Sequence, residues 1–138
     1  KFKHIRAIEK IQRHFTRRIP AMRDLSCDER LARLNVESLE IRRVRSDLVL
    51  YYKNFNGLTN FNPSDVFDVR QNVRLTRSRD KLQLCRPMCK SKVLENNFFV
   101  RRIACWNMLP DDVKNLSSVS QFKKALMFTD LSNSLLLK

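Results

Sequence analysis

The sequence has little glycine, little acidic charge and no long apolar run. One of its 138 residues is Gly, and a chain with a single Gly cannot build a Gly-rich loop that cradles phosphate. No apolar run approaches the ~20 residues that a membrane-spanning helix needs. The start of the chain is basic and periodic, without the apolar core of a secretory signal. We therefore expect an intracellular protein, cytoplasmic and nuclear, without a membrane partner.

The charge is strongly unbalanced, with 28 Lys and Arg residues against 14 Asp and Glu residues and a net charge of +14. Such an excess concentrates polyanions near a protein and favours nucleic acid or an acidic membrane as the partner. The cations are mostly Arg and occur in clusters. This pattern favours nucleic acid, because Arg contacts phosphate with two N–H groups at once. The apolar fraction of 43% is enough for a modest core, so we expect one domain or a small domain plus an arm.

Potential metal ligands are few and scattered. Cys85 and Cys89 have a spacing that occurs in zinc sites, and Cys27 and Cys105 would have to complete the ligand set. The two His residues lie far upstream, and residue 105 falls inside an expected helix. We therefore predict reduced thiols, no metal and no cofactor in this chain. A zinc-stapled binding module is the alternative.

No catalytic motif is recognised in the sequence. Ser, Cys and carboxylate residues are present, but none falls in a known nucleophile or metal motif. Asp111 and Asp112 form an acidic pair, which we interpret as favourable charge at a helix N-terminus rather than as a metal site. No catalytic residue is predicted.

Apolar spacing and capping signals predict a mainly α fold. Apolar residues at every third or fourth position predict a first helix that ends before Pro20, with its apolar stripe in the core and cations on the other face. Ser26 and Glu29 match a capping box that opens a short helix. Gly57 stands where a left-handed cap would end a long helix that begins near Ser38. Further helices are expected over residues 62–67, 96–108, 110–113 and 120–128.

Two other features complete the expected fold. Apolar and polar residues alternate near residues 73–86, which predicts a short β hairpin. The only Trp, Trp106, shares a helical face with Phe98, Phe99 and Ile103. We therefore predict that Trp106 is buried in the core and is not a platform for stacking bases.

The segment 98–110 reads Phe-Phe-Val-Arg-Arg-Ile-Ala-Cys-Trp-Asn-Met-Leu-Pro. Its pattern, Arg-x-x-x-x-Trp-Asn-x-Leu-Pro led by a Phe-Phe pair, resembles the tail of the reverse transcriptase polyprotein of non-LTR (LINE-type) retrotransposons, in the jockey-like and chicken-repeat-like branches. Other segments are similar to the same family in the same order, namely 9–19, 27–34, 38–57, 76–84 and 120–123. The resemblance spans nearly the whole chain, although the cysteines at 85 and 89 depart from the pattern.

The resemblance implies the thumb and post-thumb region of a transposable-element enzyme. The parent would be an RNA-directed DNA polymerase whose catalytic palm lies upstream, so this fragment is expected to have no enzymatic activity. A start at Lys instead of Met agrees with a piece of a longer protein. The expected domains are a basic, amphipathic, thumb-like helix at 1–20 and a helical post-thumb domain with the β hairpin at 21–138.

The expected partners are an RNA/DNA template–primer duplex and the upstream palm and fingers of the same polyprotein. Binding would go mostly to phosphate, with little readout of bases. The candidate nucleic-acid-binding residues are Lys10, Arg13, Arg17, Arg18, Arg42, Arg43, Arg45, Arg74, Arg77 and Arg79. The alternative is structural bracing of the polymerase core, in which the charge serves solubility.

Overall fold

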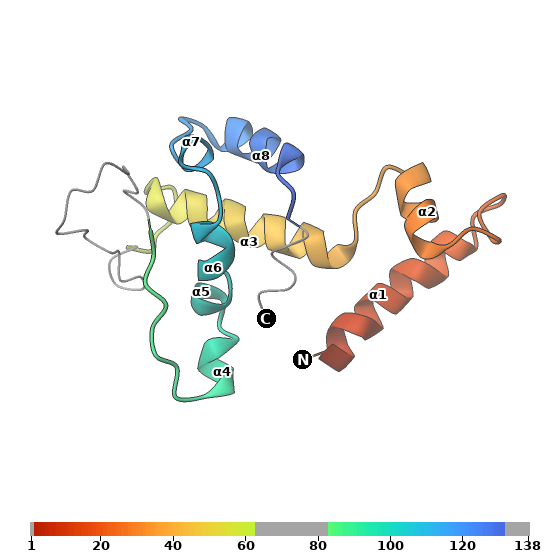
Figure 1. The fold of residues 1–138 in the computed structure, drawn as a ribbon, viewed down its shortest axis with the longest axis horizontal. Coiled ribbons are helices and arrows are strands. Elements are labelled where there is room, and N and C mark those ends of the chain that lie inside the picture. The colour runs from red at the N-terminus through yellow and green to blue at the C-terminus, as the bar shows by residue number, and fades with distance from the viewer. Residues whose placement is uncertain (1, 63–82, 132–138) are drawn as a thin grey trace. The chain divides into compact units, whose positions relative to one another are not determined.

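The computed structural model describes residues 2–62 and 83–131, and their side chains from Ile5 onward. The described residues are mainly helical (Figure 1), which confirms the predicted fold class. The chain forms two compact units, Lys1–Arg43 and Val44–Lys138. The domain boundary predicted after residue 20 separates a thumb-like helix from a post-thumb domain by their expected roles, and not by compactness. It stays a prediction.

Two expectations fall largely outside the described residues. The predicted helix at 62–67 and most of the predicted β hairpin at 73–86 lie in the part of the chain that is not described. Over 2–62 and 83–131 the structure contains no regular strand. Over the same ranges, no helix combines the length and the apolar character that crossing a bilayer requires.

The first unit contains α1 (Phe2–Arg17), α2 (Cys27–Arg33) and the first turn of α3 (Leu39–Phe55). The predicted capping box opens α2: the Glu29 N–H donates to Ser26 Oγ at 3.3 Å, and the Ser26 N–H donates to Glu29 Oε2 at 2.7 Å. Asn35 ends the helix in a left-handed conformation, with φ 51°. Both ends of α2 are therefore set by residues within one turn of it, which is why its position could be predicted.

The long helix α3 also matches its prediction. At its start the Ile41 N–H donates to Ser38 Oγ at 3.3 Å. At its end Gly57 adopts φ 65°, a left-handed conformation that costs Gly little. Figure 1 shows α3 as the long helix that runs beside α6, α7 and α8 within the second unit.

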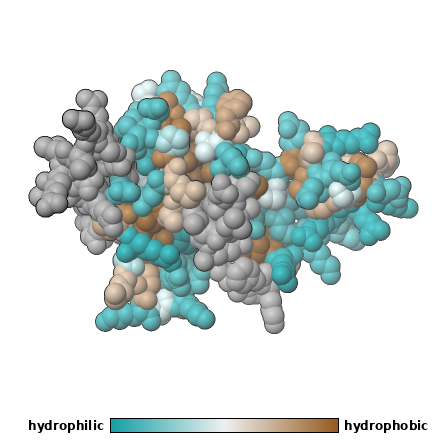
Figure 2. Space-filling model, in the orientation of Figure 1, coloured by the Kyte–Doolittle hydropathy of each residue, from teal (hydrophilic) through white to brown (hydrophobic). Residues whose placement is uncertain are grey.

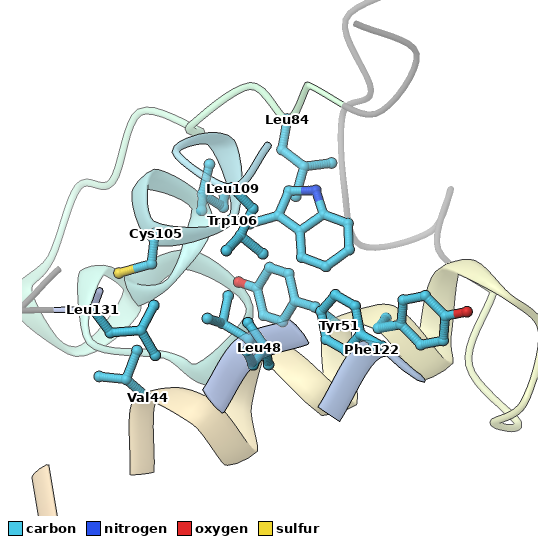
Figure 3. Close-up of a cluster of buried hydrophobic side chains, with 12 residues drawn as sticks. Val44, Leu48, Tyr51, Leu84, Cys105, Trp106, Leu109, Phe122 and Leu131 are labelled. Atoms are coloured by element: carbon cyan, nitrogen blue, oxygen red, sulfur yellow. The ribbon is translucent and has the colours of Figure 1, made fainter. Parts of the chain in front are cut away.

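The core of the second unit is built around Trp106, whose side chain is 0% exposed. The ring centroids of Phe55, Tyr51 and Phe122 lie 5.1, 5.9 and 6.2 Å from that of Trp106. Figure 3 shows the Trp106 indole with Leu84 on one side and the rings of Tyr51 and Phe122 on the other. The prediction that Trp106 is buried is confirmed. The rings beside it come from α3 and α8, elements that are distant in sequence.

The single helix predicted over 96–108 is wrong. The chain instead forms α4 (Lys92–Glu95), α5 (Phe98–Arg101) and α6 (Ile103–Asn107). Asn97 starts α5 by accepting the Phe99 N–H at 3.2 Å, and Arg102 separates α5 from α6 with φ −115° and ψ 3°. Neighbouring side chains on a regular helix point ~100° apart. The break lets Arg101 and Arg102 reach the same carboxylate, Asp47, which a continuous helix would not favour.

The last two helices are α7 (Asp111–Lys114) and α8 (Val119–Phe128). The short turn after Pro110 is as predicted, but the cap predicted at Ser120 is wrong. Ser118 caps α8, accepting the Gln121 N–H at 3.2 Å. Because α8 starts earlier, Val119 packs against the core. Phe122 and Leu126 of the same helix are fully buried in that core.

The predicted burial of the α1 stripe is wrong for its middle part, although Ile5, and Ile19 just beyond the helix, are half-buried. Ile8, Ile11 and Phe15 are 49%, 68% and 69% exposed. The helix is held instead by a neighbouring, mostly polar face, because that face finds hydrogen-bond partners in the rest of the first unit.

Candidate nucleic-acid interface

A stripe of cations lies along one face of α1. Arg6, Lys10, Arg13 and Arg17 follow one another at intervals of four, three and four residues, which places them on the same side of a helix. All four are exposed, and among the described residues none of them forms an ion pair. We name these four residues the basic stripe. It presents positive charge to solvent over about three turns, as a phosphate-binding helix requires.

Hydrogen bonds on another face of α1 attach the helix to the rest of the first unit and keep the basic stripe turned to solvent. Thr16 is buried and accepts from Nε of the buried Arg30 at 3.2 Å. The Gln12 side chain donates to the Glu37 carbonyl at 3.0 Å, and Glu9 accepts the Glu40 N–H at 2.8 Å.

The hydrogen bond of Glu9 also affects the charge of the surface. Glu9 is the only carboxylate in α1, and its hydrogen bond places it at the N-terminus of α3, where negative charge is favourable. It is half-buried there. The exposed surface of α1 consequently carries no fully exposed carboxylate that would repel phosphate.

The remaining candidate cations are distributed unevenly. Arg18 is exposed just beyond the end of α1, and Arg42 and Arg43 are exposed on α3 at the end of the first unit. Arg45 belongs to the second unit and is half-buried. Arg74, Arg77 and Arg79 lie outside the described residues. The structure thus gathers one group of candidates, Lys10, Arg13 and Arg17, on a single helical face, and adds Arg6 to them.

Several other cations are used inside the protein. Arg101 donates to both oxygens of Asp47, at 2.9 Å each, and Arg102 Nε donates to Asp47 Oδ2 at 3.0 Å. Asp47 is buried, so a buried carboxylate is matched by two guanidinium groups. Lys114 is buried beside Asp111 at 3.3 Å. These side chains stabilise the fold and are not part of a solvent-facing phosphate site.

Tyr51 lies next to this charge cluster. Burial raises the pKa of the Tyr51 hydroxyl far above its usual value, and the negative charge of Asp47 raises it further. The hydroxyl donates to the Phe98 carbonyl at 3.3 Å. Tyr51 therefore remains a protonated, buried hydrogen-bond donor at neutral pH.

The cysteines do not assemble a cluster in the described structure. Cys105 is buried in α6, whereas Cys27, Cys85 and Cys89 are half-buried. Within residues 2–62 and 83–131, no group of three or more His, Cys, Asp or Glu side chains is arranged to hold a metal ion. The expected absence of zinc stays a prediction.

Two structural residues were not found by sequence reasoning. Asp47 falls within a segment that resembles the family, and Asn107 within the Trp-Asn motif, but neither pattern indicates the contacts that these residues make. The Asn107 side chain donates to the Leu84 carbonyl and accepts the Leu84 N–H, at 2.9 Å each. A polar residue next to a buried Trp was the available signal, but its partner lies 23 positions away and could not be inferred.

Figure 2 shows that hydrophilic residues cover much of the surface where α1 and α2 lie, with apolar patches among them. Comparison with known proteins adds no relative: no protein-family model, no curated protein and no solved structure matches this chain.

Proposed function

We propose that this chain is a nucleic-acid-binding segment from the C-terminal part of a LINE-type reverse transcriptase. The observation that carries the proposal is the basic stripe of α1, in which four exposed cations lie on one face of one helix. The ordered likeness of six segments to the thumb and post-thumb region supports the same assignment. The parent would be an RNA-directed DNA polymerase, and the fragment itself would carry no catalytic residue and no cofactor.

The chemistry of the stripe favours contacts with the phosphate backbone. Exposed Lys and Arg side chains in a row along a helix neutralise phosphates and release bound counterions. Such contacts position a duplex but carry little sequence information. The proposed partner is therefore a template–primer duplex of RNA and DNA, held with little discrimination between sequences.

A second candidate is bracing of the polymerase core. Ion pairs among the described residues favour this candidate. Two cations pair with Asp47, one with Asp111 and one with Glu95. These ion pairs account for part of the positive charge without any nucleic acid. Bracing predicts that the purified chain has no appreciable affinity for duplexes.

A titration of the purified chain with an RNA/DNA hybrid duplex at two salt concentrations separates the two candidates. We expect micromolar binding at low salt and a steep loss of affinity at high salt, because each neutralised phosphate releases counterions. Absence of binding at low salt, or binding that is indifferent to salt, contradicts the proposal and favours bracing.

A further inference from the structure

A second exposed surface of α1 is apolar. Ile8, Ile11 and Phe15 are separated by three and four residues, so they form one continuous row on the helix, and each is about half exposed or more. We name these three residues the apolar stripe. Single exposed apolar residues are common, but a continuous row of large ones marks an interaction surface. The spacing i, i+3, i+7 is that of a helix that anchors itself in a groove of another protein.

The exposure of the apolar stripe follows from how α1 is held. Thr16, Gln12 and Glu9 bond to Arg30, Glu37 and Glu40, and these bonds turn a neighbouring face of α1 toward the rest of the first unit. The bonds fix the rotation of α1 about its own axis. With that rotation set, the apolar stripe lies beside the hydrogen-bonded face and is left exposed.

The charge beside the apolar stripe restricts what covers it. The helical repeat places the exposed His14 along its open edge, and the exposed Arg18 follows one turn later, just beyond the end of α1. Lys10 of the basic stripe is the next described cation around the helix. The only carboxylate of α1, Glu9, is engaged at the start of α3. A complementary surface must therefore be apolar in the centre and negatively charged at its rim.

We propose that α1 docks through the apolar stripe into an apolar groove with an acidic rim on a partner protein. The basic stripe lies on the other side of the helix, so α1 would engage such a protein and a nucleic acid at the same time. The inference does not depend on the proposed polymerase origin, because it uses only the exposure of the apolar stripe and the charges beside it.

Two other occupants fit less well. A second copy of the chain would bring another net charge of +14 to a surface already bordered by cations. A lipid surface would be entered by only three apolar side chains without a Trp, and most cations of α1 would face away from its headgroups. Both occupants are outcomes that the experiment below detects.

The test uses the full chain and a designed helical hairpin that presents a leucine-lined groove edged by glutamates. Binding is measured by calorimetry at physiological salt. The paired variant Ile11→Gln with Phe15→Gln should bind the hairpin at least about tenfold more weakly, because it removes two anchors. A hairpin with lysines in place of the glutamates should lose a similar factor. The matched control, Arg13→Gln with Arg17→Gln, should keep hairpin affinity within about twofold, because those charges are on the other side of the helix and screened.

Every other result overturns the proposal. Equal affinity of the stripe variant and the unaltered chain would show that the apolar stripe is not the docking surface. A large drop in melting temperature of the stripe variant would show that these residues support the fold. Stripe-dependent dimers in sedimentation, or stripe-dependent binding to phosphatidylserine vesicles, would assign the surface to a second copy or to a membrane.

Discussion

The side-chain amide of Asn107 binds both backbone polar groups of Leu84. Its Nδ2 donates to the Leu84 carbonyl and its Oδ1 accepts the Leu84 N–H, each at 2.9 Å. Leu84 is buried against Trp106, the residue that precedes Asn107 in the sequence (Figure 3). One dipeptide thus supplies both the apolar contact and the hydrogen bonds that hold the chain at residue 84.

Replacing Asn107 with Ala should destabilise the second unit by about 2–4 kcal/mol, because two buried backbone groups of Leu84 lose their partners. Asn107→Asp should also destabilise at neutral pH, since a charged oxygen would then face the Leu84 carbonyl. The free energy of unfolding in urea measures both effects. Asn115→Ala is the matched control, because Asn115 is exposed. An Asn107→Ala protein as stable as this control would refute the structural role.

Trp106→Ala should cost about 3–5 kcal/mol, the usual range for emptying a buried aromatic site. The reason is that Trp106 is fully buried among rings from α3 and α8. Circular dichroism monitors the thermal melt, because the variant has no Trp fluorescence. The control is Phe128→Ala, whose ring is 92% exposed and whose loss should leave the melt nearly unchanged. Overlaid melts of the Trp106 variant and the unaltered chain would contradict the core assignment.

Asp47→Asn should destabilise by about 3–5 kcal/mol, because it leaves two largely buried guanidinium groups without a counter-charge. Arg102→Gln should cost less, since Arg101 binds both carboxylate oxygens of Asp47 on its own. Asp24→Asn is the control for loss of an exposed carboxylate. Chemical unfolding of the three variants gives the comparison. Equal stability of Asp47→Asn and Asp24→Asn would show that the charge cluster contributes little.

Replacing Arg13, Arg17 and Arg18 with Gln tests the interface. The melting temperature should change little, because exposed charges contribute little to stability. Affinity for unrelated duplexes should fall alike, and the salt slope should flatten by about one unit for every phosphate that the variant no longer neutralises. The control removes the same charge elsewhere, by replacing the exposed Lys92, Lys123 and Lys124 with Gln. If both triple variants weaken binding equally, net charge and not the α1 face is responsible.

The capping box of α2 should make stability depend on acid pH. The hydrogen bonds from Ser26 lower the pKa of Glu29 below 4.5 in the folded chain. Its contribution is therefore complete above pH 4.5 and is lost as the pH falls through the lower, folded value. The difference in unfolding free energy between the unaltered chain and Glu29→Ala should shrink over that range. In Ser26→Ala, an NMR titration should show the Glu29 pKa moving back toward 4.5, and an unmoved pKa would contradict this origin.

Signals that act within a turn of helix were enough to place several element ends from the sequence alone. The Ser26–Glu29 capping box, the left-handed Gly57 and the short helical turn after Pro110 were all predicted and are all found. The apolar spacing likewise predicted a mainly helical chain with Trp106 in its core. These features are local because caps, turns and helical faces depend on residues at most a few positions apart.

The tertiary structure alone decided which groups meet across the chain. The apolar periodicity of α1 predicted a buried stripe, but hydrogen bonds to Arg30, Glu37 and Glu40 turned a different face inward. The expected helix over 96–108 is interrupted at Arg102, where Arg101 and Arg102 both bind Asp47, more than 50 positions away. A periodic pattern indicates which faces a helix has, but partners distant in sequence determine which of those faces is covered. For α1, these partners left both the basic stripe and the apolar stripe exposed.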